Sequence, residues 1–168
     1  MNSIDRRSVL KGAAFAMTAG ATSRVVAAPQ SRMGDPVIAR ADMALVDIES
    51  GRIAGYVSNG VFTFKGVPYA DTTAGAARFQ PPRKPKSWTG VRSSRQYGFV
   101  CPQDKGTGRQ NDEEAFMFAW DDGVQNEDCL SVNVWTPALG DAKKRPVMVW
   151  LHGGGSTAGS GQELRSYD

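Results

Sequence analysis

Short runs of alternating apolar and polar residues dominate the first half of the domain-like part of the chain. Apolar and polar side chains alternate over residues 44–49, and the pattern resumes over residues 52–57 after a Ser50-Gly51 break. A period of two is the pattern of a half-buried strand. Asn59-Gly60 is typical of a two-residue hairpin turn, because both residues tolerate positive φ. We therefore expect a small antiparallel meander over residues 44–65.

The middle of the chain lacks this alternation. Residues 66–100 contain several prolines among Gly, Arg and Lys, but the large aromatic side chains between them are uncommon in solvated linkers. An irregular, packed segment is expected there. Residues 104–126 are mostly polar and acidic, and they predict a loop with one short helix at most.

Two further strands are expected near the end of the chain. Residues 130–135 alternate, whereas residues 147–151 form a continuous apolar run, Val-Met-Val-Trp-Leu, typical of a strand covered on both faces. A turn-rich connection, "PALGDAKKRP", separates them. Directly after the apolar run, the only histidine, His152, precedes three consecutive glycines, Gly153, Gly154 and Gly155.

The glycine run leaves backbone N–H groups open to approach, because glycine has no side chain. Such a turn can hold an anion, or the charge that develops on a carbonyl oxygen during acyl transfer. Gly153-x-Gly155-x-x-Ala158 formally matches a dinucleotide-binding fingerprint, but residues 156–161 are a poor helix start and no P-loop lysine follows. The run also fits a structural glycine-rich turn or the oxyanion hole of an α/β-hydrolase.

The first 27 residues have the layout of an export signal. Arg6-Arg7 precedes a mildly apolar Gly/Ala-rich stretch at residues 12–21, and Val25-Val26-Ala27 offers small residues suited to cleavage. The layout predicts a twin-arginine signal over residues 1–27, with an ordinary basic N-terminal segment as the alternative. The apolar stretch is too short and too interrupted to span a bilayer as a helix, so no membrane partner is expected after signal removal.

Charge argues against a nucleic-acid partner. Residues 1–27 carry four basic side chains and one acidic side chain, a net charge of +3, which is also the net charge of the whole chain. The rest of the chain is therefore neutral. A neutral chain lacks the basic surface on which nucleic-acid binding depends.

The two cysteines, Cys101 and Cys129, fit an exported protein, because an oxidising compartment lets a single disulfide persist. Two buried free thiols are the alternative. Their separation of 28 residues lacks the paired spacing of zinc ligands, so no metal site is expected.

Several stretches together resemble the type B carboxylesterase family, the group that includes cholinesterases and bacterial para-nitrobenzyl esterases. They occur in family order: "FKGVPYA" at 64–70, "RFQPP" at 78–82, Trp88, "CPQ" at 101–103, "NEDCLSVNVWTP" at 126–137 and "PVMVWLHGGGSTAGSG" at 146–161. The resemblance implies an α/β-hydrolase fold, represented by the N-terminal strands of its mixed sheet up to the oxyanion loop, an incomplete domain. It divides the chain into the signal, a mature N-terminal extension at 28–41 and the N-terminal part of a carboxylesterase domain at 42–168.

The resemblance also implies roles for residues of the glycine run. Gly154 and Gly155 match the residues that donate backbone N–H groups to the oxyanion, and Gly153 matches the glycine that lets the turn form. His152 matches the residue before these glycines, not the catalytic histidine, and is expected to hydrogen-bond or pack beneath the loop. Many relatives have phenylalanine where this chain has Ser156, which changes the expected shape of the acyl pocket.

Two pairs outside the run have implied structural roles. Cys101 and Cys129 match the family's disulfide, which closes a loop near the gorge entrance. Arg78 and Glu127 match a structural ion pair buried beneath that loop. No cofactor is implied.

The family's nucleophile lies in a G-x-S-x-G pentapeptide, and no such pentapeptide occurs in this chain. The sequence therefore reads as the N-terminal portion of a longer, exported serine carboxylesterase, periplasmic or extracellular, that hydrolyses small carboxylic esters through an acyl-enzyme. We expect the chain alone to be inactive. The alternative is a non-catalytic, cholinesterase-like binding or adhesion module.

Overall fold

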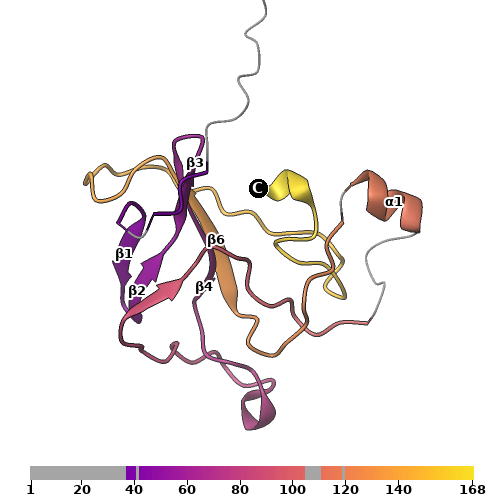
Figure 1. Ribbon diagram of the computed structural model, residues 1–168. Helices are drawn as coiled ribbons and strands as arrows, with labels where there is room; N and C mark the ends of the chain where they lie inside the picture. The colour runs from indigo at the N-terminus through magenta and orange to yellow at the C-terminus, as the bar shows by residue number, and fades with distance from the viewer. Residues whose placement is uncertain (1–36, 41, 105–110, 119) are drawn as a thin grey trace, which may run out of the picture. The chain divides into compact units, whose positions relative to one another are not determined.

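A computed structural model of the protein describes residues 37–40, 42–104, 111–118 and 120–168, which belong to one compact unit, Met33–Asp168. The expected signal at residues 1–27 lies outside the described residues, as does most of the expected extension at 28–41. Two small sheets of three strands each form the frame of the described unit (Figure 1).

The first sheet has the strand order β1-β2-β5 and is mixed. Strand β1 (Leu45–Ile48) pairs antiparallel with β2 (Gly51–Ala54) across a tight turn, and β5 (Val91–Ser93) pairs parallel with β2. β5 lies within the segment that was expected to be irregular. The sequence did not predict this strand, because three residues without alternation carry no strand pattern.

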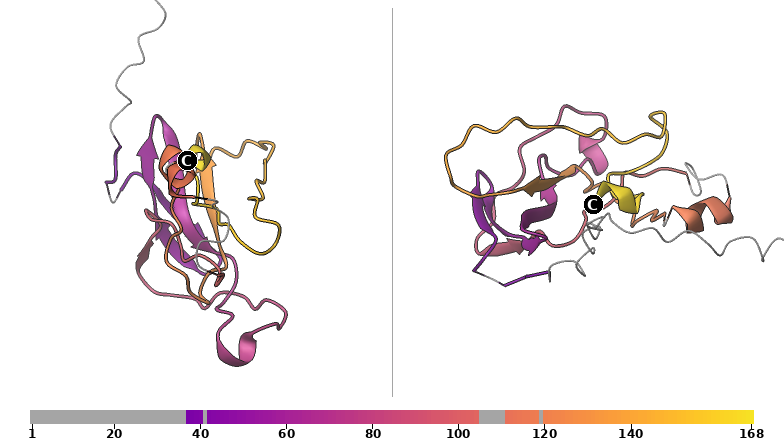
Figure 2. Two further views of the ribbon diagram at one scale, coloured as in Figure 1. Left: turned by 90° about the vertical axis from the view of Figure 1, so that its right-hand side faces the viewer. Right: turned by 90° about the horizontal axis from the view of Figure 1, so that it is seen from above.

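The second sheet has the order β3-β4-β6 and is antiparallel throughout. β3 (Tyr56–Ser58) and β4 (Val61–Pro68) form the predicted hairpin, in which Asn59 and Gly60 have φ of 50° and 74°. β6 (Ser131–Thr136) lies beside β4 although the two are distant in sequence, as two views of the ribbon show (Figures 1 and 2). The strands expected over residues 44–65 and the first of the two later strands are therefore confirmed, but the expected single meander is wrong: β1-β2 and β3-β4 are two hairpins that belong to different sheets.

The core joins the two sheets. Ile53 of β2 and Phe64 of β4 are buried with Ala44, and they are flanked by partly buried apolar residues: Val46, Ile48, Val57, Phe62, Val67, Trp88 and Leu139. The chain passes from β2 to β3 through Gly55, where a Cβ would lie 2.2 Å from the Thr63 carbonyl oxygen. Glycine is needed at this position because the two backbones approach so closely.

Regular structure outside the sheets is short. Helix α1 (Asp112–Met117) is the short helix allowed for in the acidic loop, and the Asn111 side chain caps it by accepting a hydrogen bond from Glu114 N at 2.7 Å. Two 3-10 turns, η2 (Gly75–Ala77) and η3 (Arg165–Tyr167), are the remaining elements of the residues that the structure describes. No helix in the described part of the chain is long and apolar enough to cross a membrane.

The expected strand at residues 147–151 is wrong for this structure. These residues form no strand, and their exposed fractions lie between 66% and 91%. A strand buried on both faces needs neighbouring strands to pair with its backbone and layers to cover its side chains. No described strand pairs with residues 147–151, so the segment stays outside both sheets and exposed.

Candidate active site

The three glycines enter an exposed turn that closes on itself. The Gly154 carbonyl oxygen accepts hydrogen bonds from the backbone N–H groups of Thr157 and Ala158 and from Thr157 Oγ1, each at 3.1 Å. Gly154 and Gly155 have φ of 109° and 61°, and Ser156 follows with 64°. Three successive left-handed residues turn the chain sharply at the point where the sequence predicts an oxyanion loop.

The amides of this turn are free to act on a ligand. Among the described residues, neither the Gly154 nor the Gly155 N–H donates a hydrogen bond, and both residues are exposed. A Cβ on Gly154 would lie 1.9 Å from the Ala158 carbonyl oxygen, whereas a Cβ on Gly155 would meet nothing within 4 Å. Only glycine fits at 154, and the arrangement leaves two N–H donors available to an anion or a polarised carbonyl oxygen.

His152 points its ring back at the turn. Its Nδ1 lies 2.7 Å from the Gly153 carbonyl oxygen, which requires the proton on Nδ1. The side chain is exposed and does not pack beneath the loop. Of the two alternative roles that the sequence suggests for His152, hydrogen bonding or packing, the structure has the local hydrogen bond.

The far end of the turn is held by two residues to which the sequence assigned no role. The Gln103 side chain accepts a hydrogen bond from Gly159 N at 2.8 Å and donates one from Nε2 to Gly159 O at 3.2 Å. Glu163, only 5% exposed, accepts a hydrogen bond from Ser160 N at 3.0 Å. Ser160-x-x-Glu163 has the spacing of a capping box, a signal that points to Glu163; no local pattern pairs Gln103 with Gly159.

The segment after the turn is anchored to β4. Lys65 Nζ lies 2.5 Å from Asp168 Oδ2 and 4.1 Å from the centre of the Tyr97 ring, and the Lys65 side chain is almost fully buried. Burial lowers the pKa of Lys65, but its contacts with Asp168, Tyr56 and Tyr97 outweigh burial and hold it above its ordinary value. Lys65 therefore stays charged and ties the segment after the glycine turn to the second sheet.

Arg78 and Glu127 form an ion pair, with 2.7 Å between Arg78 Nη1 and Glu127 Oε1. The side chain of Arg78 is 58% exposed and that of Glu127 is 25% exposed. The expected ion pair is therefore present, but the expectation that it is buried is wrong. Glu127 Oε2 also accepts a hydrogen bond from Thr73 Oγ1 at 2.6 Å. The carboxylate thus fastens the loop after β4 to the segment before β6.

Cys101 and Cys129 lie next to each other as free thiols. Burial raises the pKa of the Cys129 thiol to about 11, and the adjacent Cys101 thiol is the second cause. Cys101 is the more exposed of the two. The structure thus brings Cys101 and Cys129 together but has no disulfide bond between them.

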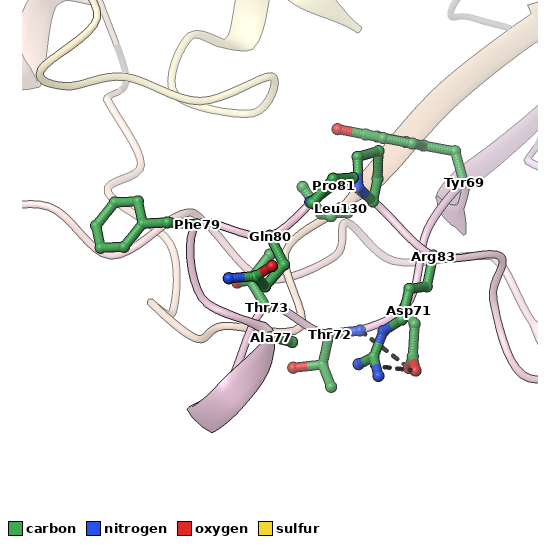
Figure 3. Close-up of a pocket in the computed structure, with 11 residues that line it drawn as sticks. Tyr69, Asp71, Thr72, Thr73, Ala77, Phe79, Gln80, Pro81, Arg83 and Leu130 are labelled. Carbon is green, nitrogen blue, oxygen red and sulfur yellow. Dashed lines mark hydrogen bonds and ion pairs between the residues drawn. The ribbon is translucent and has the colours of Figure 1, made fainter.

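A separate groove lies against the start of β6 (Figure 3). Its lining is mainly the segment that follows β4, including Thr73 and Pro81, together with Leu130. Asp71 and Arg83 form an ion pair within this lining, and Phe79, which is 93% exposed, also belongs to it (Figure 3). None of the glycines of the turn lines this groove. Among the described residues, no cluster of His, Cys, Asp and Glu side chains could hold a metal ion.

A model of the carboxylesterase family matches residues 42–168, the whole segment that carries both sheets and the glycine turn. The chain belongs to the carboxylesterase family. Among relatives of this carboxylesterase chain, phenmedipham hydrolase of Pseudarthrobacter oxydans is 40% identical over 112 residues, covering 67% of the chain and 22% of the relative. Para-nitrobenzyl esterase of Bacillus subtilis is 38% identical over 120 residues, covering 71% of the chain and 23% of the relative.

Solved structures show the same relationship. An esterase from Clostridium hathewayi that can hydrolyse aliphatic aromatic polyesters superposes with a TM-score of 0.65 at 36% identity, over 76% of the carboxylesterase chain and 24% of the solved chain. A structure of PNB esterase superposes with a TM-score of 0.60 at 38% identity, over 74% and 24%. The chain thus has the N-terminal part of an α/β-hydrolase fold, and it spans roughly a quarter of the length of these relatives.

Proposed function

We propose that residues 152–161 form the oxyanion loop of a serine carboxylesterase. The observation that carries the proposal is the pair of exposed Gly154 and Gly155 amides, which have no hydrogen-bond acceptor among the described residues. The negative charge on a carbonyl oxygen grows as an ester is attacked, and two N–H donors stabilise that charge more than they stabilise the uncharged ester.

The proposed reaction has two steps. A serine Oγ attacks the ester carbonyl carbon, the oxygen of the resulting tetrahedral species accepts hydrogen bonds from the two amides, and the alcohol leaves with the serine proton. Water then attacks the acyl-serine and releases the carboxylic acid. Residues 1–168 contain no G-x-S-x-G pentapeptide, so the proposal assigns the nucleophile and its histidine base to polypeptide outside these residues.

The substrate class that we propose is small carboxylic esters. Support comes from family membership and from the names of relatives such as para-nitrobenzyl esterase. A binding module without catalysis is the rival function, but binding alone gives no reason for three unobstructed glycines in a sharp turn. No cofactor takes part in the proposed reaction.

The proposal is tested in a chimera. Residues 42–168 replace the matched segment of the Bacillus subtilis para-nitrobenzyl esterase, which supplies the rest of an esterase fold. We expect the chimera to hydrolyse para-nitrophenyl acetate, because this chain's glycine turn then faces a nucleophile. A folded chimera without turnover contradicts the proposed function.

The 168-residue chain by itself should not hydrolyse para-nitrophenyl acetate above background. Acyl transfer needs a nucleophile, a base and an oxyanion site, and this chain offers only part of the third, since the residue after the nucleophile supplies a further donor. The matched control is His152→Ala. Turnover that is clear in the unmodified chain and lost in the control would identify His152 as a catalytic base and overturn this assignment.

We also propose that the protein is exported by a twin-arginine signal at residues 1–27. The support is Arg6-Arg7 ahead of a Gly/Ala-rich stretch and the neutral charge of the remaining chain. Replacing both arginines by lysine keeps the charge and should leave the precursor in the cytoplasm, as measured by cell fractionation. Normal export of the double-lysine variant excludes the twin-arginine route.

A further inference from the structure

The carboxamide of Gln103 meets the backbone of Gly159 in the manner of a strand pair. Its Oε1 accepts a hydrogen bond from Gly159 N at 2.8 Å, and its Nε2 donates one to Gly159 O at 3.2 Å. The backbone N–H and the carbonyl oxygen of Gly159 are thus both hydrogen-bonded by the Gln103 side chain. A neutral amide is the group that can do this, because it carries an acceptor and a donor in one plane.

Gln103 belongs to a segment whose backbone is held by several hydrogen bonds. Its backbone N–H donates to Gln125 Oε1 at 3.0 Å. Val100, three residues earlier, donates to Val124 O at 2.9 Å and accepts from Asn126 N at 3.0 Å. The carboxamide is therefore held from the side of its own backbone, and Gly159 is held through it.

Gly159 is also close to the start of the glycine turn. A Cβ at Gly159 would lie 2.7 Å from the Gly153 carbonyl oxygen and 2.9 Å from His152 Nδ1. The turn between them is closed by the hydrogen bonds from Thr157 and Ala158 to Gly154 O. A shift of Gly159 must therefore be passed to Gly153 and Gly154 or be absorbed by breaking the turn.

We propose that Gln103 is the positioning residue of the oxyanion loop. It touches neither of the donating glycines; it fixes Gly159, and Gly159 fixes the end of the turn whose beginning carries the Gly154 and Gly155 amides. This inference rests on the proposed function of the loop. Glu163 supports the same end through Ser160 N, but it offers an acceptor alone.

Two variants separate the contributions. Gln103→Ala removes both hydrogen bonds to Gly159, together with the one that Nε2 donates to Cys101 O at 3.3 Å. Gln103→Glu keeps the size and the acceptor, but at neutral pH it sets a carboxylate oxygen against Gly159 O where a donor stood. When the pH falls below the ordinary glutamate pKa of about 4.3, the carboxyl group is protonated and regains a donor. Gln96→Glu, at an exposed position outside the turn, is the matched control for the charge change.

The first measurement is amide hydrogen exchange in the 168-residue chain. We expect Gly159 N–H to exchange about tenfold faster in Gln103→Ala than in the unmodified chain, the scale of one to two lost hydrogen bonds. In Gln103→Glu the loss should appear at neutral pH and diminish below pH 4, relative to the unmodified chain at each pH. Equal exchange in all variants overturns the proposal.

The second measurement is steady-state kinetics of the chimera described above. Both Gln103 variants should lower kcat by about 10-fold to 100-fold with KM within about twofold, because a displaced oxyanion loop weakens transition-state binding and not ester binding. A trifluoromethyl ketone, which forms a tetrahedral oxyanion on the serine, should lose affinity by the same factor, and Gln96→Glu should change neither quantity.

The outcomes distinguish the two proposals. If the unmodified chimera folds but does not hydrolyse esters, the proposed function fails and this inference fails with it. If the chimera is active and the Gln103 variants match it in kcat and in inhibitor affinity, only the inference fails. A rise in KM without a change in kcat also overturns it, because that result assigns Gln103 to ester binding.

Discussion

Alanine in place of Gly154 should lower kcat of the active chimera by about 10²–10³, the scale of losing one oxyanion donor. The added Cβ would lie 1.9 Å from the Ala158 carbonyl oxygen, a backbone atom that cannot rotate away. The φ of 109° is also strained for any residue with a side chain. The turn must open to accept the methyl group, and the opening displaces the amide. Steady-state hydrolysis of para-nitrophenyl acetate measures the loss.

The neighbouring glycines provide graded controls. A Cβ on Gly155 meets nothing within 4 Å, so alanine there suffers only from the φ of 61°. Gly153 has open space and is not in the left-handed region, so Gly153→Ala should cost less than about tenfold, since it introduces neither strain nor overlap. The expected order of damage is 154, then 155, then 153. Equal losses at all three positions contradict the geometry of the turn.

A disulfide between Cys101 and Cys129 should form in the oxidised protein and stabilise it by about 3–4 kcal/mol on the chain-entropy estimate. The two thiols are already neighbours. With glutathione disulfide as the oxidant, Cys101 and Cys129 lose two electrons and two protons, and two glutathione molecules are formed. Non-reducing peptide mapping of exported protein should recover the linked pair. Two free thiols in folded, exported protein exclude the bond.

The stability of the reduced protein should fall at alkaline pH, because the Cys129 thiol ionises there. Burial raises the pKa of Cys129 to about 11, above its value in the unfolded chain. The contribution of the buried thiol to stability is therefore complete below the unfolded pKa of about 8.5 and is lost as the pH rises toward 11. This loss should be absent once the disulfide forms, because no thiol is left to ionise. Thermal unfolding of both forms between pH 8 and pH 11 checks the difference.

The parts of the fold that the sequence predicted are those with local signals. The Asn59-Gly60 turn and the alternating strands around it need only neighbouring residues, and they occur as expected. β5 has only three residues and depends on pairing with β2, which no local pattern encodes. The strand at residues 147–151 was predicted from a continuous apolar run, and such a run becomes a strand only where partners exist.

Some residues of the candidate site likewise have a local sequence signal, and others do not. The glycines at 153–155 are recognisable because close backbone approach requires glycine. Gln103 is far from Gly159 in sequence, and a side chain that binds a distant backbone leaves no periodic trace. Ser160-x-x-Glu163 could have been recognised, since its spacing is that of a capping box, although the structure uses it to hold a turn and forms no α-helix there.

The exposed apolar run at residues 147–151 is expected to make the isolated chain prone to aggregation. Five consecutive exposed apolar residues, whose backbone pairs with no strand in the described part of the chain, are the kind of segment that stacks with an identical segment of another molecule into an intermolecular sheet. Lys143 and Lys144 stand shortly before Pro146 and the run, whereas the charge of Arg145 is paired with Asp141. Like charges of the two lysines that in-register stacking would bring together repel one another. We therefore expect the two lysines and Pro146 to slow such self-association, as gatekeeper residues beside an apolar strand do.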